Sequence, residues 1–317
     1  MSFISNRLTY FDSSDFRTAV NKKLILENAI DLSIGVPEEL TPEHIKAAGI
    51  RAIENDHTTY TPANGMPELR AALAHKLTQE NGIPCNEQTV TVVPGLTTGL
   101  LLVYLALLDP GDEVIVFDPY YPPYPYLASS IGAHVVYVPT LPDFQPDLPF
   151  VEACITNRTK LIIVNSPNNP TGAVYTEATL RKIANIADKH NLLVLSDEIY
   201  EHFVYEKKHF SIGSIYPNTI TMNGFSKEYA MTGWRLGYIA GPAEIIDALN
   251  QLQQYIVMSS SSITQHAALA ALTHRPQIQD KYRRKRDYLL SHLRHMGFEV
   301  HGAEGSFFAF VKAPHDL

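Results

Sequence analysis

The stretch NGFSKEYAMTGWRLGY, residues 223–238, is the most informative part of this 317-residue chain. It follows an apolar run and places Lys227 in a turn beside a serine and a glycine. Arg235 follows eight residues later, directly after the only tryptophan of the chain. A solvated surface lysine needs no such neighbours, so the pattern indicates a lysine held at a defined place. Because a lone lysine or arginine usually lies on the surface, this interpretation depends on what surrounds it in the fold.

Short apolar segments alternate with amphipathic helical patterns from residue 89 onward. Strands that are apolar throughout are typical of a parallel sheet covered on both faces. We therefore predict an α/β three-layer sandwich with a mostly parallel seven-stranded sheet, together with a small, incomplete α/β domain. Near residue 43 a helix is expected, with Thr41 as its N-cap. The expected strands are 89–93, 113–117, 134–138, 160–165, 191–197, 219–223 and 236–241.

Composition narrows the class of protein. The net charge is −8 and there is no basic block, so we expect no nucleic-acid partner. The longest apolar run, residues 100–108, is about half the ~20 residues that a membrane span needs, so no membrane partner is expected either. The two cysteines lie far apart and no signal peptide begins the chain, which favours a cytoplasmic location.

Ligands of such sheets bind beyond the carboxyl ends of the strands, so the residues that follow each strand are candidates for a site. Together they suit a ligand with a phosphate, a flat ring, a protonatable nitrogen, a phenolic oxygen and an aldehyde. Pyridoxal 5′-phosphate has all five features. The candidates are Gly95, Leu96, Thr97, Ser226 and Arg235 for the phosphate, Tyr121 for stacking, Asp197 for the nitrogen, Asn169 and Tyr200 for the phenolic oxygen, and Lys227 for an imine.

Each of these residues has a simpler interpretation when it is taken alone. Asp197 could be a helix N-cap, Tyr121 a core aromatic, and residues 166–172 an ordinary turn. Their shared placement at the ends of successive strands favours a common site.

The motifs SPNNPTG (166–172), SDEIYEHFVY (196–205) and NGFSKEYAMTGWRLGY (223–238) resemble those of the fold-type I pyridoxal-phosphate-dependent aminotransferases, in the bacterial aspartate aminotransferase-like branch. Weaker matches at 58–77, 107–116 and 265–272 extend the resemblance over about 300 residues. It implies transamination between an L-amino acid, aspartate-like in this branch, and a 2-oxo acid. It also implies a homodimer with shared sites.

The resemblance assigns a role to each candidate. Lys227 would form an imine with the cofactor and then move the proton at the α-carbon of the substrate. Asp197 would keep the ring nitrogen protonated, and Tyr121 would stack on the ring. Tyr200 and Asn169 would bind the phenolic oxygen, and Gly35 and Asn169 would contact the substrate. The phosphate would be bound by Gly95, Leu96, Thr97, Ser226 and Arg235. Tyr60 would bind the phosphate in the partner subunit. A cis bond is implied at Asn169–Pro170.

The sequence departs from the family pattern in two places. Gly224 stands where some relatives carry a second phosphate-binding serine, and no residue after Phe310 matches the arginine that binds the substrate's α-carboxylate. We therefore expect residues 1–45 to form an N-terminal arm and part of the small domain, 46–275 the large cofactor-binding domain, and 276–317 the truncated start of the C-terminal small domain.

Other functions stay open at this point. Another enzyme of the same fold, such as a carbon–sulfur β-lyase, would share the chemistry of Lys227. A cofactor-binding remnant without activity would fit the absent C-terminal region. A sensor domain fused to a DNA-binding module is disfavoured because residues 1–45 hold no basic module.

Overall fold

The chain is described by a computed structural model that covers residues 3–11, 30, 32 and 35–312. All seven predicted strands form one sheet in the order β1-β7-β6-β5-β4-β2-β3. Strands β2 to β6 run parallel to one another, and β7 is antiparallel to both β1 and β6. The predicted seven-stranded, mostly parallel sheet is therefore confirmed. Its strands are β1 Val90–Val93, β2 Glu113–Asp118, β3 His134–Pro139, β4 Thr159–Asn165, β5 Leu193–Asp197, β6 Thr219–Gly224 and β7 Gly237–Ala240.

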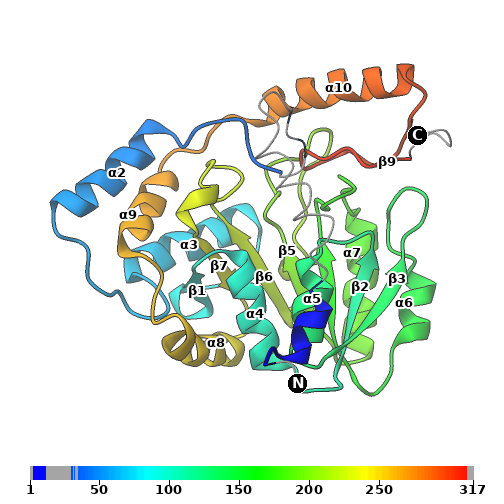
Figure 1. Cartoon of the computed structure of the whole chain (residues 1–317), viewed down its shortest axis with the longest axis horizontal. Coiled ribbons are helices and arrows are strands. Elements are labelled where there is room, and N and C mark those ends of the chain that lie inside the picture. The colour runs from blue at the N-terminus through cyan, green and yellow to red at the C-terminus, as the bar shows by residue number, and fades with distance from the viewer. Residues whose placement is uncertain (1–2, 12–29, 31, 33–34, 313–317) are drawn as a thin grey trace.

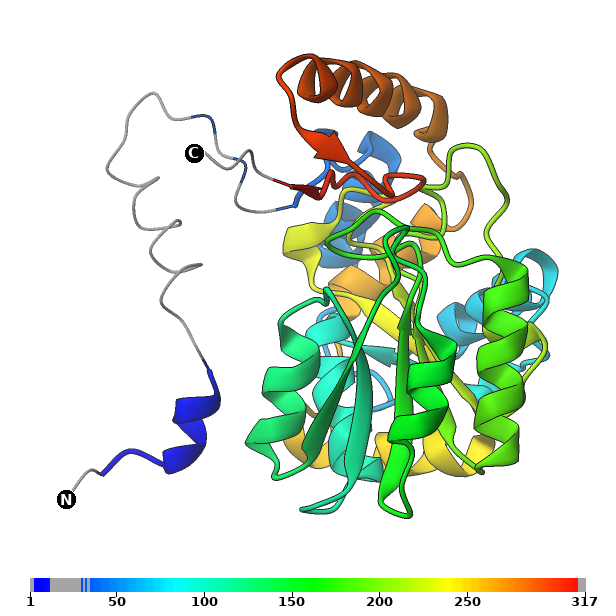
Figure 2. The same cartoon turned by 90° about the vertical axis from the view of Figure 1, so that its right-hand side faces the viewer.

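Helices cover the sheet on both sides (Figures 1 and 2). One core cluster joins α4, α5 and α8 to one face of the sheet. On the other face, a second cluster joins α3 and α9 to the sheet, and a third joins α7 to it. Helix α2 packs on α9. The bounds are α2 Glu43–Glu54, α3 Pro67–Glu80, α4 Leu96–Leu107, α5 Pro123–Ser130, α6 Leu148–Cys154, α7 Glu177–Lys189, α8 Ala243–Ile256, α9 Ser262–Ala271 and α10 Gln279–His295.

The central strands are apolar because both of their faces are buried. In β4, Leu161 and Ile163 belong to the cluster beneath α4, whereas Ile162 and Val164 belong to the cluster beneath α7. Successive side chains of a strand point to opposite faces, so a doubly covered strand has no polar face to show. This packing explains why the continuous apolar runs in the sequence located the strands.

The predicted N-cap of α2 was wrong. The helix begins at Glu43 after Pro42, which has no capping side chain, and the Thr41 hydroxyl is engaged elsewhere. It donates to the carbonyl oxygen of Ala230 at 2.7 Å and accepts from the indole nitrogen of Trp234 at 3.1 Å. Tertiary contacts with the Lys227 loop thus outweigh the local capping preference.

The C-terminal part lies beside the sheet rather than in it. Helix α10 and the two-stranded pair β8 (Glu299–Val300) and β9 (Val311–Lys312) form a separate group above the strands in Figures 1 and 2. Between β8 and β9 the chain lies against the segment that follows β5, where Gly305 forms an isolated bridge with Val204 and the amide of Ser306 donates to the carbonyl oxygen of Phe203. The domain boundaries drawn at residues 45 and 275 stay predictions.

Among the residues that the structure describes, no helix combines the length and the apolar character required to cross a bilayer.

Candidate active site

Two neighbouring parallel strands end in polar residues at the same edge of the sheet. Asn165 is the last residue of β4 and Asp197 the last of β5, and the two strands pair at these positions. The Asn165 side chain donates to the Asp197 carbonyl oxygen at 3.1 Å and accepts from the amide of Asn169 at 2.8 Å. Asn165 thereby attaches the loop that carries Asn169 to the strand end that carries Asp197.

Lys227 follows the next strand, β6, and its side chain is largely shielded from water. Its amine donates to the carbonyl oxygen of Gly35 at 2.7 Å and lies 5.9 Å from the ring centre of Tyr200. Burial, and then the charge of Arg235, lower the pKa of Lys227 to about 8, whereas Asp197 acts in the opposite direction. A lysine with such a pKa has an appreciable neutral, nucleophilic fraction near neutral pH.

Asp197 is a buried carboxyl group with few partners. One oxygen accepts from the Tyr124 hydroxyl at 2.8 Å and the other from the amide of Ile199 at 3.2 Å. Burial raises the pKa of Asp197 to about 6 although both hydrogen bonds lower it. A carboxylate in this position would be stabilised by a cationic nitrogen in front of it.

Tyr200 and Tyr121 contribute aromatic rings and hydroxyls to the same region. Burial raises the pKa values of both tyrosines. A hydrogen bond with Asn169 acts against this for Tyr200, and a hydrogen bond with Thr97 acts against it for Tyr121. The peptide bond between Asn169 and Pro170 is cis, as predicted, and so are those before Pro119 and Pro167.

A second feature of the site is a cradle between the start of α4 and Arg235. Gly95 is the N-cap of α4 with φ +86°, and a Cβ added to it would collide with the Arg235 guanidinium. Arg235 itself has a left-handed backbone and donates to the carbonyl oxygen of Thr232 at 2.9 Å. Free amides of a helix N-terminus and a guanidinium together form an anion site, with Leu96 and Thr97 in its first turn.

Gly224 explains one departure of the sequence from the family pattern. A Cβ at this position would lie 3.0 Å from the Cα of Gly237 and 3.0 Å from the carbonyl oxygen of Leu236. These are backbone atoms of the neighbouring strand, so a serine does not fit here unless the sheet moves. Ser226, in the turn two residues later, remains as the hydroxyl next to Lys227.

The structure brings together the predicted site residues other than Tyr60, with Ser226 placed there by its position next to Lys227. Gly35 lies over the site, with its carbonyl on Lys227, and a Cβ on Gly35 would lie 2.7 Å from the ring of Phe308. Tyr60, in contrast, is 82% exposed to solvent. Its side chain therefore has no place in the buried site of its own chain.

Sequence reasoning missed four residues of this site. Tyr124 binds Asp197, Asn165 connects the loops, and Phe307 and Phe308 lie near Lys227 and Gly35. Tyr124 stands in a run with several tyrosines, residues 120–126, and only helical spacing from Tyr121 could have distinguished it. The two phenylalanines come from a distant segment, and no local pattern indicates that it packs against Lys227 and Gly35.

A desolvated lysine, a buried carboxyl group and an anion cradle at the strand ends of an α/β sheet define a class of enzymes that use pyridoxal phosphate. Residues 27–316 match the family model described as aminotransferase class I and II. The chain belongs to this family, whose members depend on pyridoxal phosphate and catalyse transamination.

Relatives agree with the family. The chain is 44% identical over 292 residues to the probable aspartate/prephenate aminotransferase of Thermus aquaticus, covering 89% of this chain and 76% of that protein. The Thermus thermophilus aspartate aminotransferase structure with maleate has TM-score 0.94 and 41% identity, covering 98% and 85% of the two chains. The Pyrococcus furiosus alanine aminotransferase structure has TM-score 0.91 and 37% identity, covering 99% and 86%.

The described residues fit this cofactor. The cradle that a Cβ on Gly95 would fill suits a phosphate, and the buried carboxyl of Asp197 suits a protonated ring nitrogen. Lys227 is close enough to both features to feel their charges: Arg235 lowers the pKa of Lys227 and Asp197 raises it.

We predict that Lys227 titrates anomalously in protein freed of cofactor. Reductive methylation at a series of pH values, read by peptide mass spectrometry, should modify Lys227 with a midpoint near pH 8. Solvent-exposed lysines, whose free amines titrate near ~10.4, provide the internal reference. Arg235→Met should raise the midpoint of Lys227 because it removes a nearby cation. A midpoint that coincides with the exposed lysines would contradict the desolvated site.

We also predict a pH-dependent stability effect of Asp197. Its pKa in the folded chain, about 6, exceeds the ordinary value of 3.8, so the folded state loses stability as the pH rises from about 3.8 through about 6. In cofactor-free protein, Asp197→Asn should gain stability relative to wild type as the pH rises from 4 to 7, by up to roughly 3 kcal/mol. Urea unfolding at both pH values measures this, and a pH-independent difference would refute it.

Proposed function

We propose that this chain is an aspartate-type aminotransferase that moves an amino group from an aspartate-like L-amino acid to a 2-oxo acid. The observation that carries the proposal is the half-buried amine of Lys227, which binds the carbonyl oxygen of Gly35 beside the ring of Tyr200 and has a pKa lowered by burial and by the charge of Arg235. Names of the relatives support the substrate class, since aspartate, prephenate and a bound dicarboxylate, maleate, occur in them.

Lys227 is the group that we propose for both covalent attachment and proton transfer. Bound pyridoxal phosphate supplies an aldehyde and an electron-accepting ring. The neutral amine of Lys227 would hold the cofactor at its aldehyde carbon, and the same nitrogen would serve as the base that takes and returns the α-carbon proton of the substrate. Burial and the cation of Arg235 keep that nitrogen available as a base near neutral pH.

The residues around Lys227 would hold the ring. Asp197 holds a proton on the ring nitrogen, because a buried carboxylate that lacks a cation strongly favours one. Tyr200 and Asn169 would donate hydrogen bonds to the phenolic oxygen, and Tyr121 would stack on the ring. Tyr124 fixes the carboxyl of Asp197 in place.

The phosphate would lie in the cradle at the start of α4. Gly95, Leu96 and Thr97 offer amides and a hydroxyl, and Ser226 adds a second hydroxyl. The guanidinium of Arg235 supplies the charge, with a fork of donors that a lysine does not have. Gly35 and Asn169 would contact the substrate.

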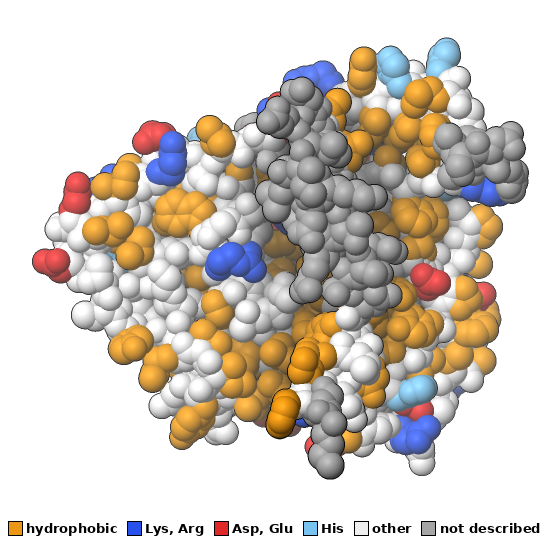
Figure 3. Space-filling view, viewed as in Figure 1, with side chains coloured by type: hydrophobic (Ala, Val, Ile, Leu, Met, Phe, Trp, Pro, Cys, Tyr) orange, Lys and Arg blue, Asp and Glu red, His pale blue; other side chains and the backbone are white. Residues whose placement is uncertain are grey.

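A homodimer is part of the proposal, with Tyr60 reaching the cofactor phosphate of the neighbouring subunit. Hydrophobic side chains gather over α8 and α4 on the face shown in Figure 3. Leu105, Tyr255, Ile256 and Met258 on or next to these helices are exposed, and an apolar patch of this kind suits a subunit interface. The two free cysteines, Cys85 and Cys154, are consistent with the cytoplasm as its location.

Borohydride reduction of the yellow protein should attach the mass of the cofactor to Lys227. Lys227→Ala should still bind some cofactor but should lose transamination by at least about a thousandfold, since both the nucleophile and the base are removed. Peptide mass spectrometry and single-turnover absorbance measure the two effects. Label on another lysine, or activity that survives the substitution, would refute the assignment.

The amino donor is tested in the same absorbance assay. Aspartate should convert the cofactor faster than alanine or phenylalanine does. A preference for alanine, the donor in the name of the Pyrococcus furiosus relative, would replace aspartate in the proposal while leaving Lys227 in its role.

Tyr60→Phe should weaken cofactor binding without dissociating the dimer. Loss of one hydrogen bond to a charged phosphate corresponds to roughly a tenfold or greater rise in Kd. Tyr288→Phe is the matched control, because Tyr288 on α10 is 69% exposed and has no proposed role. Absorbance titration measures the Kd of the cofactor, and sedimentation measures the oligomeric state. An unchanged Kd, or a monomer that binds cofactor with wild-type affinity, would refute the shared site.

A further inference from the structure

A buried polar layer lies behind the residues that form the site. Asp197 and Tyr200 belong to the site, whereas Glu198, Glu201 and His202 of the same segment bind a separate set of partners. The Glu201 carboxylate accepts from the side chains of Asn81 at 2.5 Å and Asn223 at 2.7 Å, and it also binds the ammonium of Lys76.

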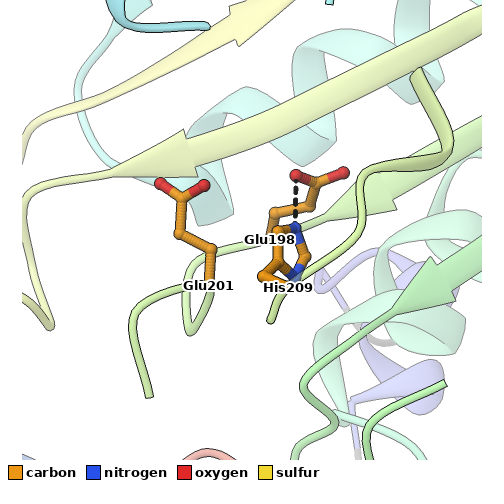
Figure 4. Close-up of side chains that lie close together, drawn as sticks. All are labelled: Glu198, Glu201 and His209. Carbon is orange, nitrogen blue, oxygen red and sulfur yellow. Dashed lines mark hydrogen bonds and ion pairs between the residues drawn. The ribbon is translucent and has the colours of Figure 1, made fainter. Parts of the chain in front are cut away.

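The first candidate in this layer is a metal site at Glu198, Glu201 and His209, whose ligand atoms lie within 4.8 Å of one another. Figure 4 shows the Glu198 carboxylate bonded to His209, with Glu201 apart from them. The oxygens of Glu198 also accept from Ser196 and Ser211, at 2.8 and 2.6 Å. Because the Lys76 ammonium already supplies the positive charge at Glu201, these carboxylates are hydrogen-bonded partners of the protein rather than vacant ligands.

A second feature of the layer is the bond between His202 and Glu228. The two side chains meet at 2.8 Å, and Arg275 binds the other oxygen of Glu228 at 3.0 Å. Burial lowers the pKa of His202, but the carboxylates of Glu201, Glu228 and Glu80 outweigh burial and raise it to about 9. His202 is therefore a cation that donates to a buried carboxylate, and such a bond is strong and directional.

The positions of His202 and Glu228 in the chain show which parts of the site their bond connects. His202 stands two residues after Tyr200, and Glu228 directly follows Lys227. The Asn223–Glu201 bond makes a parallel connection, because Asn223 lies near the end of β6 and Glu201 directly follows Tyr200. Two buried bonds thus join the segment of Tyr200 to the segment of Lys227.

We propose that His202 is a positioning residue for transamination, whose bond to Glu228 sets the place of the Lys227 amine relative to Tyr200 and Asp197. The inference rests on the roles proposed above for these three residues. Its effect is mechanical, since burial, Arg235 and Asp197 are the influences on the charge state of Lys227 and Glu228 is absent from them. A displacement of about 1 Å at a reacting group can cost roughly a hundredfold in rate.

The test compares His202→Leu with His202→Asn in protein loaded with cofactor. Asparagine keeps an N–H donor close to the place of Nδ1, whereas leucine keeps only bulk. We expect His202→Leu to lower kcat by roughly ten- to a hundredfold with little change in KM. It should also reduce the visible circular dichroism of the bound cofactor, which reports its orientation. His202→Asn should restore both values to within about threefold of wild type.

Arg158→Met is the control for a general loss of stability. Arg158 pairs at 3.0 Å with the buried carboxylate of Glu113, which begins β2 at the opposite edge of the sheet from the site. This variant should lower Tm but leave kcat and the dichroism unchanged. Equal losses in the leucine and asparagine variants, or a wild-type dichroism and kcat in His202→Leu, would overturn the positioning role. Wild-type protein without a borohydride label on Lys227 would instead refute the proposed function.

Discussion

The buried amine of Lys227 is the constraint on which the rest of the site depends. A charged amine loses most of its hydration there, so the surroundings favour the neutral form, and Arg235 strengthens that preference. The arginine can occupy this place because position 95 is a glycine, which leaves room for the guanidinium against the start of α4. One close packing contact thus both creates an anion cradle and adds to the effect of burial on the pKa of the lysine.

Burial acts on Asp197 in the same way, but here the charge that burial disfavours is negative. Its carboxyl group is buried, and the hydrogen bonds from Tyr124 and the amide of Ile199 offset only part of the desolvation cost. A cationic ring nitrogen would complete the missing ion pair and favour the ionised form. The folded chain is therefore arranged to gain electrostatic stabilisation when a ligand brings a positive charge to Asp197 and a negative charge to Arg235.

Sequence reasoning located the sheet and most of the site because both depend on local patterns. Doubly buried strands are apolar throughout, and parallel strands end at one edge, so Asp197 and Lys227 could be assigned to a common site before any coordinates. Contacts between distant segments carry no such signal. Thr41, which a local rule assigns to a helix cap, binds the loop after Lys227 instead, and Phe307 reaches Lys227 from about 80 residues away.

The polar layer behind the site raises a question of energetics. Buried ion pairs often stabilise a fold no more than apolar side chains of equal volume would. They differ in geometry, because hydrogen bonds between charged groups are directional whereas apolar contacts tolerate sliding. Where a lysine must meet two partners at once, a defined position matters more than additional stability. Residues 197–202 can satisfy both requirements, since Asp197 and Tyr200 belong to the site whereas Glu201 and His202 bind Asn223 and Glu228.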